Sequence, residues 1–414
     1  MIFTPEEDDG GDQGLRPLYI RSILNSLGTG AIQPFLGPYA VMLGASSSDM
    51  GWYQSLTNLS THVMQVFWGE MSDRLRRRIP FIFFGTLMTT VAWIPMIFAN
   101  SVQQLIILIA IQYLLGSAAT PAWTALIGDL VPPARLGRAA ASISLWSSIG
   151  GLIATLFSGI IMVHVGGSIQ NEFLIPFLIA IICGFASSIA MLQVKEKEDN
   201  IRTRIHNRGL FEDMLNIIIQ AERNRDFFKY CMVNVVFAFF MSIAWPLFSI
   251  TLIRVLNATM LEVSLLSVVQ GIAIIIFQKW AGKLTDTLGR RPLLVAFRTG
   301  LFLVPLAYAF APNVYCLIIF NFYLGLITSL GQASATAYIL DISPEEYRGG
   351  FVAFFNLLYG IACFTGSLLG GYLSDVAVSI YGLVVGLQIV YIISSCGRFF
   401  GGLLFLSLNE SLRK

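Results

Sequence analysis

The sequence contains little charge for its length. Only 12% of its 414 residues are Asp, Glu, Lys or Arg, whereas 56% are hydrophobic. Soluble domains carry about 25% charged residues, so this chain lacks the polar side chains that would cover a water-soluble protein of its size. The shortage excludes a soluble globular protein and indicates that lipid surrounds most of the molecule.

Residue patterns that carry covalent chemistry are also missing. The five cysteines show no C-x-x-C spacing and fall within apolar stretches, so neither a disulfide framework nor a metal site is expected. No glycine-rich loop with a lysine is present to hold a nucleotide phosphate, which excludes ATP as the energy source. No nucleophile stands beside a base. The sequence therefore predicts that the protein is not an enzyme and needs no cofactor and no nucleic acid.

Hydrophobic runs are abundant instead. A helix needs about 20 mostly apolar residues to cross a bilayer. Twelve runs approach that length, and each is predicted to be a helix because lipid offers no water to an open backbone. The predicted fold class is an all-α membrane protein with twelve transmembrane helices. The runs are residues 18–43, 50–69, 79–99, 103–126, 138–165, 173–194, 227–254, 262–282, 292–311, 314–339, 350–373 and 379–408.

Basic residues gather in every second loop between these runs. The loops after the second, fourth, sixth, eighth and tenth runs are basic, whereas the alternate loops hold one basic residue, Arg254. Lys and Arg mark the cytoplasmic side of a membrane protein. The chain is therefore expected to cross the cell membrane many times, with both termini in the cytoplasm. Its acidic start, "TPEEDDGGDQG", lacks the basic residues of a signal peptide, so the first run is expected to remain as a span.

Two of the basic loops are near-copies of each other. "GEMSDRLRRR" at 69–78 aligns with "GKLTDTLGRR" at 282–291 at an offset of 213 residues. A second pair, "GDLVPPARLG" at 128–137 and "LDISPEEYRG" at 340–349, aligns at an offset of 212. Ordered repeats of this kind predict two related halves of six helices each. The loop residues of interest are Gly69, Asp73, Arg74, Arg77, Arg78 and Asp129 in the first half and Gly282, Asp286, Arg290, Arg291 and Asp341 in the second.

The repeat divides the chain into four segments. We expect an acidic cytoplasmic tail at 1–17, an N-terminal six-helix bundle at 18–194, a cytoplasmic linker at 195–226 and a C-terminal six-helix bundle at 227–414. The linker contains "GLFEDMLNIIIQAERN" at 209–224, a pattern typical of an amphipathic helix on the cytoplasmic membrane face.

The G-x-x-x-D-R-x-x-R-R loop, its second copy and the twelve runs in two halves resemble the major facilitator superfamily. The resemblance covers the whole chain and implies secondary transport by alternating access. It also implies a solute site between the halves near the middle of the membrane, with helices 1, 4, 7 and 10 along the pathway.

The duplicated loops have a physical interpretation as a gate. Asp73 and Asp286 stand at the membrane edge, where a carboxylate can face the positive N-terminal end of a helix. The resemblance implies that helices 11 and 5 of the opposite half provide these ends. The nearby arginines can bridge to Asp129 and Asp341, and such contacts would hold the cytoplasmic side shut. The alternative is that the loops only anchor the orientation of the chain, which does not require Gly and Asp at fixed spacing twice.

Uncharged polar residues within the spans are candidates for the solute site. A polar side chain inside the membrane usually faces a cavity or a partner helix. The alternative is that these residues only make hydrogen bonds between helices. The predicted substrate-binding residues are Asn25, Thr29, Gln33, Gln112, Thr120 and Trp123 in the first half and Asn234, Trp245, Asn321, Gln332, Asn356 and Tyr359 in the second.

Charged or titratable groups inside the spans are few. His62, halfway along the second run, is a candidate proton site, although a neutral histidine in helix packing is the alternative. No Asp or Glu stands in the middle of any run, so the usual carboxylate proton carrier is missing. Arg21 and Arg398 are expected to extend to the cytoplasmic headgroups. Anion binding is the alternative for Arg398.

Three functions fit this sequence. The first is a transporter, expected to be a monomer, of a small organic and neutral or lipophilic solute, with or without H⁺ or Na⁺ as the coupling ion. The second is a proton-coupled efflux antiporter for drugs or metabolites. Proton-coupled members of the superfamily often carry Arg where this sequence has Gln112, and exporting antiporters often carry Gly-Pro in the fifth run, which this sequence lacks. Both departures count against the second function. The third is a membrane sensor or lipid-handling protein that keeps the fold without moving solutes.

Overall fold

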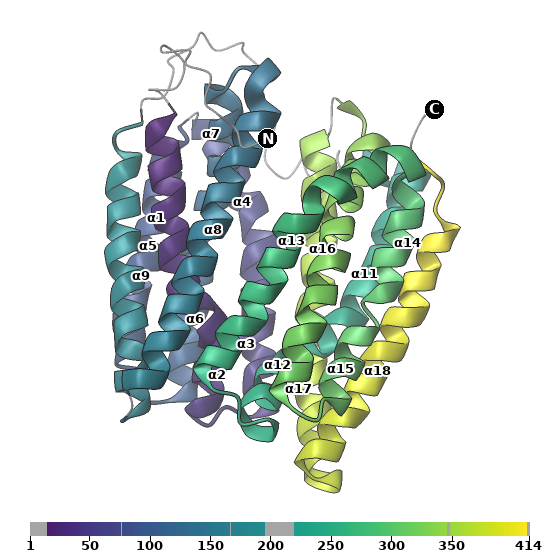
Figure 1. Cartoon of the computed structure of the whole chain (residues 1–414). Helices are drawn as coiled ribbons and strands as arrows, with labels where there is room; N and C mark the ends of the chain where they lie inside the picture. Colours follow the sequence, from purple (N-terminus) through teal and green to yellow (C-terminus); the bar gives the residue numbers. More distant parts are fainter. Residues whose placement is uncertain (1–14, 76, 166, 195–218, 346–347, 412–414) are drawn as a thin grey trace.

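The computed structural model describes residues 15–75, 77–165, 167–194, 219–345 and 348–411. Within these ranges the regular structure is helical throughout (Figure 1). Ten helices are long and apolar enough to cross a membrane. The two remaining predicted spans, 18–43 and 50–69, are each divided into shorter helical segments. The structure therefore confirms an all-α membrane fold, and these two spans complete the predicted twelve.

The helical segments of the first half follow the six predicted runs in order. They are α1 (Arg16–Ile32), η1 (Gln33–Phe35), α2 (Leu36–Met42), α3 (Ser47–Leu59), η2 (Ser60–Met64), α4 (Gln65–Leu75), α5 (Ile79–Ile97), α6 (Val102–Gly116), α7 (Ala119–Leu130), α8 (Pro133–Val165) and α9 (Ile169–Met191).

The segments of the second half repeat this order. They are α11 (Arg225–Ile243), α12 (Trp245–Ile250), η3 (Thr251–Val255), α13 (Met260–Leu288), α14 (Arg290–Gly300), α15 (Leu303–Phe310), α16 (Val314–Ile342), α17 (Arg348–Tyr381), α18 (Leu383–Leu403) and η5 (Leu404–Ser407). Of the linker, residues 219–223 are helical, and the rest of the predicted amphipathic helix, like the tail before residue 15, lies outside the described residues. The four segment boundaries stay a prediction.

Proline and glycine explain where several spans break or end. Pro34 has no backbone N–H to donate, and the first span changes there to the 3₁₀ turn η1. Pro246 stands in the first turn of α12, just after α11 ends. Gly382 adopts φ 79° and ends α17, as a glycine after a helix commonly does. Residues 379–381 therefore belong to the eleventh span, whereas the sequence placed them in the twelfth.

The helices form two bundles that repeat the same packing. In the first bundle α1 packs against α8 and α9, and in the second α11 packs against α17 and α18. The main contacts between the bundles are α3 with α17 and α8 with α13, which are related pairs in the repeat. Figure 1 shows the bundles side by side, converging toward one end of the molecule and spread at the other.

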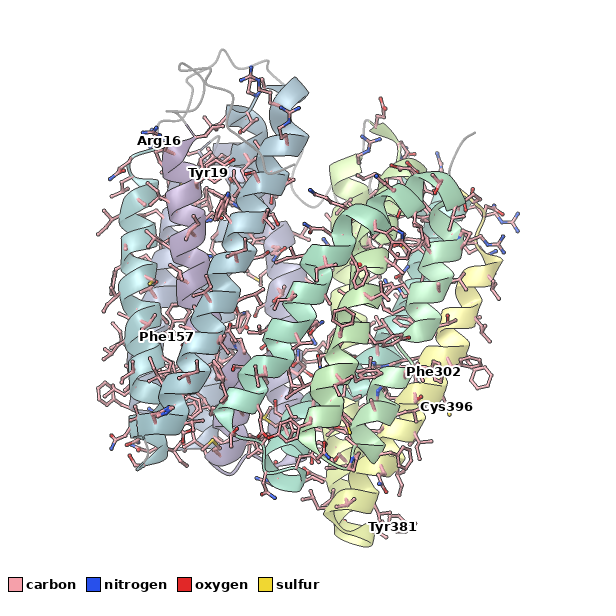
Figure 2. All side chains as sticks on the ribbon, in the orientation of Figure 1. Arg16, Tyr19, Phe157, Phe302, Tyr381 and Cys396 are labelled. Carbon is pink, nitrogen blue, oxygen red and sulfur yellow. The ribbon has the colours of Figure 1, made fainter. Side chains whose placement is uncertain are left out.

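The two ends of the molecule differ in charge. Figure 2 places Arg16 at one end and Tyr381 at the other. We call the end with Arg16 the basic face, because the duplicated arginine loops lie there, and the end with Tyr381 the opposite face. Between them the lateral surface exposes large apolar side chains such as Phe157, Ile182 and Phe400, which suits contact with lipid.

Small residues allow the two bundles to approach closely. A Cβ atom added at Gly371 of α17 would lie 2.9 Å from the Cα of Gly51 in α3 and 2.6 Å from the carbonyl oxygen of Ser47. A Cβ added at Gly159 of α8 would lie 2.6 Å from the Cβ of Ser264 in α13. Both contacts between the bundles therefore depend on a glycine, as helix contacts in membranes often do.

Replacing Gly371 with a large residue will separate the bundles at the opposite face. We expect Gly371→Leu to lengthen the distance between spin labels at Gln103 and Tyr315, two exposed positions at that face, in a background without the native cysteines. Gly349→Leu is the control, because Gly349 begins the same helix and a Cβ there meets nothing within 4 Å. Equal distance distributions in both variants would contradict the expectation.

Candidate functional site

A polar cavity of about 760 Å³ lies within the first bundle. It extends from Gln33 and Tyr113, in the middle of their spans, to Gly128 and Leu136 near the basic face. Segments of the first, second, third, fourth and fifth spans line it. The broken first and fourth spans contribute to the wall, where the turn at Gln33 and the break after Gly116 interrupt the helices.

The structure brings together all six candidate residues of the first half. Because Asn25, Thr29 and Gln33 are spaced by four, one face of the first span presents them to the cavity. Gln112, Thr120 and Trp123 of the fourth span line the other side. All six line a cavity within the first half, whereas the resemblance implied a site between the halves, and their role in binding a solute stays a prediction.

The deep end of the cavity contains two amides with different hydrogen bonds. Gln33 Nε2 donates to the Tyr113 hydroxyl over 2.7 Å. Gln112 is buried, and its Oε1 has no hydrogen-bond partner among the described residues. An unpaired buried acceptor costs roughly 1–3 kcal/mol, so Gln112 is suited to accept a hydrogen bond from a bound molecule.

Arg21 also lines the cavity, which the sequence analysis did not predict. Its side chain is 5% exposed, its Nη2 donates to Thr86 Oγ1 over 3.2 Å, and its guanidinium carbon lies 4.2 Å from the ring centre of Trp123. The expectation that Arg21 extends to the headgroups was wrong. The helix turns this side chain toward α5 and α7, where a hydroxyl and an aromatic face replace part of its hydration.

The six candidate residues of the second half do not line this cavity. Asn234 is buried, donates to the carbonyl of Tyr230 over 2.9 Å and accepts from Arg298. Asn321 donates to the carbonyl of Leu317 over 2.8 Å. Both amides thus make hydrogen bonds within their own half, as the packing alternative expects, and their role in binding a solute stays a prediction. Gln332 is exposed, and Trp245, Asn356 and Tyr359 are partly buried.

Two further buried arginines occupy the second bundle. Arg298, which was not among the predicted residues, is 6% exposed. Its guanidinium carbon lies 4.8, 5.1 and 5.4 Å from the ring centres of Phe237, Phe297 and Phe405. It follows the apolar stretch 292–297 in the middle of α14, so the signal in the sequence was a single charge directly after an apolar run. Its Nη2 donates to Asn234 Oδ1 over 2.9 Å.

Arg398 is 2% exposed and does not reach the headgroups, so that expectation was wrong. Its guanidinium donates to the carbonyls of Leu301, at 3.2 Å, and Met241, at 2.6 Å. Leu301 lies in the break between α14 and α15, and Met241 lies in the last turn of α11. Carbonyls at helix ends lack partners within the helix, so the breaks supply the acceptors that hold this cation.

His62 lies where the second and eleventh spans meet. It belongs to the π-helical turn η2, and its ring centre is 5.1 Å from that of Tyr359 in an edge-to-face arrangement. A Cβ added at Gly360 would lie 2.7 Å from the Cβ of His62, so the two helices are in close contact there. The histidine therefore lies between the bundles, and its role as a proton site stays a prediction.

At the basic face the arginines of the duplicated loops pair within their own bundles. Arg78 Nε lies 3.5 Å from Asp129 Oδ2, and Arg290 Nε lies 3.2 Å from Asp341 Oδ2. Gly69 packs against Pro121 of its own half. Arg290 also pairs with Asp286, and Arg74 pairs with Glu70. The backbone N–H of Arg291 donates to Glu410, and Arg77 is exposed. A Cβ added at Gly282 would meet nothing within 4 Å, and the side chain of Asp73 lies outside the described residues.

Hydrogen bonds that join described residues of the two bundles all lie in one region. Among the described residues, every such bond involves the stretch 45–58 of the first half, and none joins the bundles at the basic face. The Asp375 carboxylate of α17 accepts from the backbone N–H groups of Ser47 and Ser48, both over 3.0 Å. Arg254 donates to the carbonyl of Ala45 over 2.7 Å. The molecule is therefore closed at the opposite face.

These features define a class of protein. Two related six-helix bundles, a polar cavity that extends toward one face and hydrogen bonds that close the other face are the properties of a membrane transporter.

Comparison with known proteins agrees with this class. The profile of the Major Facilitator Superfamily matches residues 18–227 and 230–413. The chain is 26% identical over 377 residues to "Multidrug resistance protein MdtG" of Proteus mirabilis, covering 87% of this chain and 89% of that protein. It is 23% identical over 393 residues to "Multi-drug resistance efflux pump PmrA homolog" of Lactococcus lactis, covering 92% of each. The chain belongs to the Major Facilitator Superfamily and is a secondary transporter.

Solved structures share the fold at low sequence identity. The crystal structure of the nucleoside transporter NupG superposes with a TM-score of 0.72 and 13% identity, covering 95% of this chain and 98% of that one. The D-xylose–proton symporter superposes with a TM-score of 0.71 and 14% identity, covering 96% and 99%. At such identities the likeness concerns the fold alone.

Removing the charge of Asp375 will weaken closure of the opposite face. A carboxylate at a helix N-terminus with two N–H donors contributes roughly 1–2 kcal/mol, and Asn cannot replace the charge. We expect Asp375→Asn to increase the population with a long distance between labels at Gln103 and Tyr315. Glu262→Gln is the control, because Glu262 caps α13 through Thr259 within one bundle. If both variants opened equally, Asp375 would have no specific role between the bundles.

Proposed function

We propose that the protein moves a small organic solute across the cell membrane by alternating access, and that the cavity of the first bundle is part of the solute site. The observation that carries the proposal is a polar cavity inside the spans of a molecule whose bundles are joined at the opposite face. A solute entering from the basic face would meet hydroxyl and amide groups, and closure by Asp375 would prevent its passage to the other side.

The proposal places the basic face and both termini in the cytoplasm. Its support is the excess of Lys and Arg in the loops of that face. The structure then corresponds to the inward-open state. In the outward-open state the duplicated loops would approach the other bundle, so that Asp73 and Asp286 could face helix ends there.

The lining of the cavity supports an organic solute with hydrogen-bonding groups. Most of its polar side chains are uncharged, among them Asn25, Thr29, Gln33 and Gln112. A neutral or lipophilic solute was predicted on the premise that the lining holds no charge. Arg21 changes that premise for one end of the cavity, while the amides at the deep end continue to favour an uncharged portion of the solute.

Proton-coupled efflux of drugs or metabolites is the second candidate. It is favoured by the similarity to two relatives that are named for multidrug resistance and efflux. His62 between the bundles is the candidate proton site for this function. A transport rate that rises with an imposed pH gradient would support proton coupling, whereas Na⁺ coupling or facilitated diffusion would not show this response. The remaining alternative, a sensor without transport activity, is less favoured because a sensor does not need a gate at each face.

A ligand screen tests the position of the site. A solute that binds the folded protein raises its melting temperature by mass action. We expect a solute found by a thermal-shift screen of metabolites and drugs to lose most of its effect in Gln33→Ala and Gln112→Ala and to keep it in Gln103→Ala, an exposed glutamine of the same helix as Gln112. The same solute should be transported into proteoliposomes. A solute whose effect survives both cavity substitutions would show that the site lies elsewhere.

Asp73 tests the gate. We expect Asp73→Asn to abolish or strongly slow uptake into proteoliposomes while the yield and melting temperature of the purified protein stay near those of the wild type, because the charge is needed only when the basic face closes. Glu70→Gln, in the same helix and paired with Arg74, is the matched control. Transport by Asp73→Asn at the wild-type rate would refute a gating role.

A further inference from the structure

Arg21 carries a buried charge for which the described part of the chain provides no counter-ion. Its neighbours are the hydroxyl of Thr86 and the face of Trp123, and it makes no ion pair with a described carboxylate. Its Nε is buried without a hydrogen-bond partner among the described residues. A buried charge is unfavourable unless it is paired and hydrogen-bonded, and an arginine stays protonated in proteins. The site therefore lacks a negative charge.

The second bundle holds a related cation in a different environment, although its Nε also lacks a hydrogen-bond partner among the described residues. Asn234 and Arg298 follow Arg21 and Thr86 by 213 and 212 residues, and in both halves an arginine bridges the two helices concerned. Arg298 is enclosed by three aromatic rings and the oxygen of Asn234, and it does not line the cavity. Arg21 has one ring and one hydroxyl, and it lines the cavity. Within the described part of the chain both arginines therefore keep a free Nε, and the difference between them is that Arg21 lines the cavity of about 760 Å³, where a ligand has room, and Arg298 does not.

We infer that Arg21 is an anion subsite of the solute cavity, and that the transported solute is a small organic anion with a carboxylate or phosphate group. The anionic group pairs with the guanidinium beside Trp123. The uncharged body of the solute extends along Asn25 and Thr29 toward the amides of Gln33 and Gln112. Arginine suits this task because its planar donors match the two oxygens of a carboxylate or phosphate. The inference rests on the proposed function, since it assigns the chemical class of solute to the same cavity.

The length of the cavity beyond Arg21 favours a soluble anion over a lipid headgroup. Polar lining continues from Arg21 along the first span to Gln33, three turns farther into the membrane. A lipid headgroup at Arg21 would leave this hydroxyl- and amide-lined space unused, because its acyl chains belong in an apolar environment. The test therefore includes a lipid arm.

The experiment compares phenyl-bearing probes of similar size that differ in charge, with phenylacetate and phenylacetamide as the matched pair. Purified protein is titrated with phenylacetate, phenyl phosphate and the neutral phenylacetamide, and binding is followed by the shift in melting temperature. We expect at least one anion to bind the wild type about tenfold more tightly than the amide, since a hydrogen bond to a charged group is worth about one decade or more in affinity. Arg21→Gln should abolish this preference. Arg16→Gln, which removes an exposed arginine from the same helix, should keep it.

Two substitutions at Thr86 separate binding from stability. Thr86 Oγ1 lies 3.2 Å from Arg21 Nη2, so Thr86→Asp places a carboxylate on the guanidinium from within the protein. We expect Thr86→Asp to be at least as heat-stable as Thr86→Asn and yet to lose the anion preference, whereas Thr86→Asn keeps it. A merely structural role for Arg21 would not produce this separation. The pair also tests the inference if Arg21→Gln does not fold.

The remaining outcomes overturn the inference. The first two are that the anions and the amide stabilise the wild type equally, or that no probe stabilises it. The third is that the anion preference survives in Arg21→Gln or in Thr86→Asp. The fourth is that only anionic lipid in nanodiscs stabilises the protein in a way that depends on Arg21. Transport of a neutral solute from the ligand screen without any anion preference would remove the anion subsite and leave the proposed function intact. If anions bound but no solute were transported, the anion subsite would stand and the proposed transport function would fall.

Discussion

A membrane-embedded chain has to satisfy its polar groups from within, and this constraint shapes the whole molecule. Helices satisfy the backbone, and each break in a helix releases carbonyls that need other donors. Arg398 meets this need in the second bundle, where it donates to the carbonyls of Met241 and Leu301. The cation and the two helix breaks depend on each other, which accounts for a fully buried arginine that pairs with no carboxylate in the described part of the chain.

The same constraint makes the cavity of the first bundle unusual. In the second bundle the related positions are surrounded by aromatic rings, and the amides of Asn234 and Asn321 make hydrogen bonds within that bundle. In the first bundle the polar groups are left facing a space, with an unpaired amide oxygen on Gln112 and a cation on Arg21. The two halves repeat the same helix contacts but differ inside: the first contains the polar cavity and the second contains a cluster of buried aromatic side chains.

Closure of the opposite face follows from small residues and one carboxylate. Gly51 and Gly371 let two helices approach until the Asp375 carboxylate reaches the N-terminal N–H groups of α3. The contact is a helix-end interaction of the same kind that the duplicated loops were expected to make at the basic face. Opening one face and closing the other then requires only one type of interaction. A carboxylate–helix contact is broken at one end of the molecule while a similar contact forms at the other.

The sequence by itself determined the class of fold, because hydropathy, alternating basic loops and a repeat at a constant offset are local or periodic properties. It also predicted that Asn25, Thr29 and Gln33 share one helix face, since they are spaced by four, but it did not predict that their cavity lies within the first bundle. Tertiary structure decided which polar residues face space and which are satisfied by neighbours, as Asn234 and Asn321 show. It also decided the direction of Arg21, Arg298 and Arg398, because a long side chain can extend to the interface or turn inward, and only the groups that other helices bring near it make one direction more favourable.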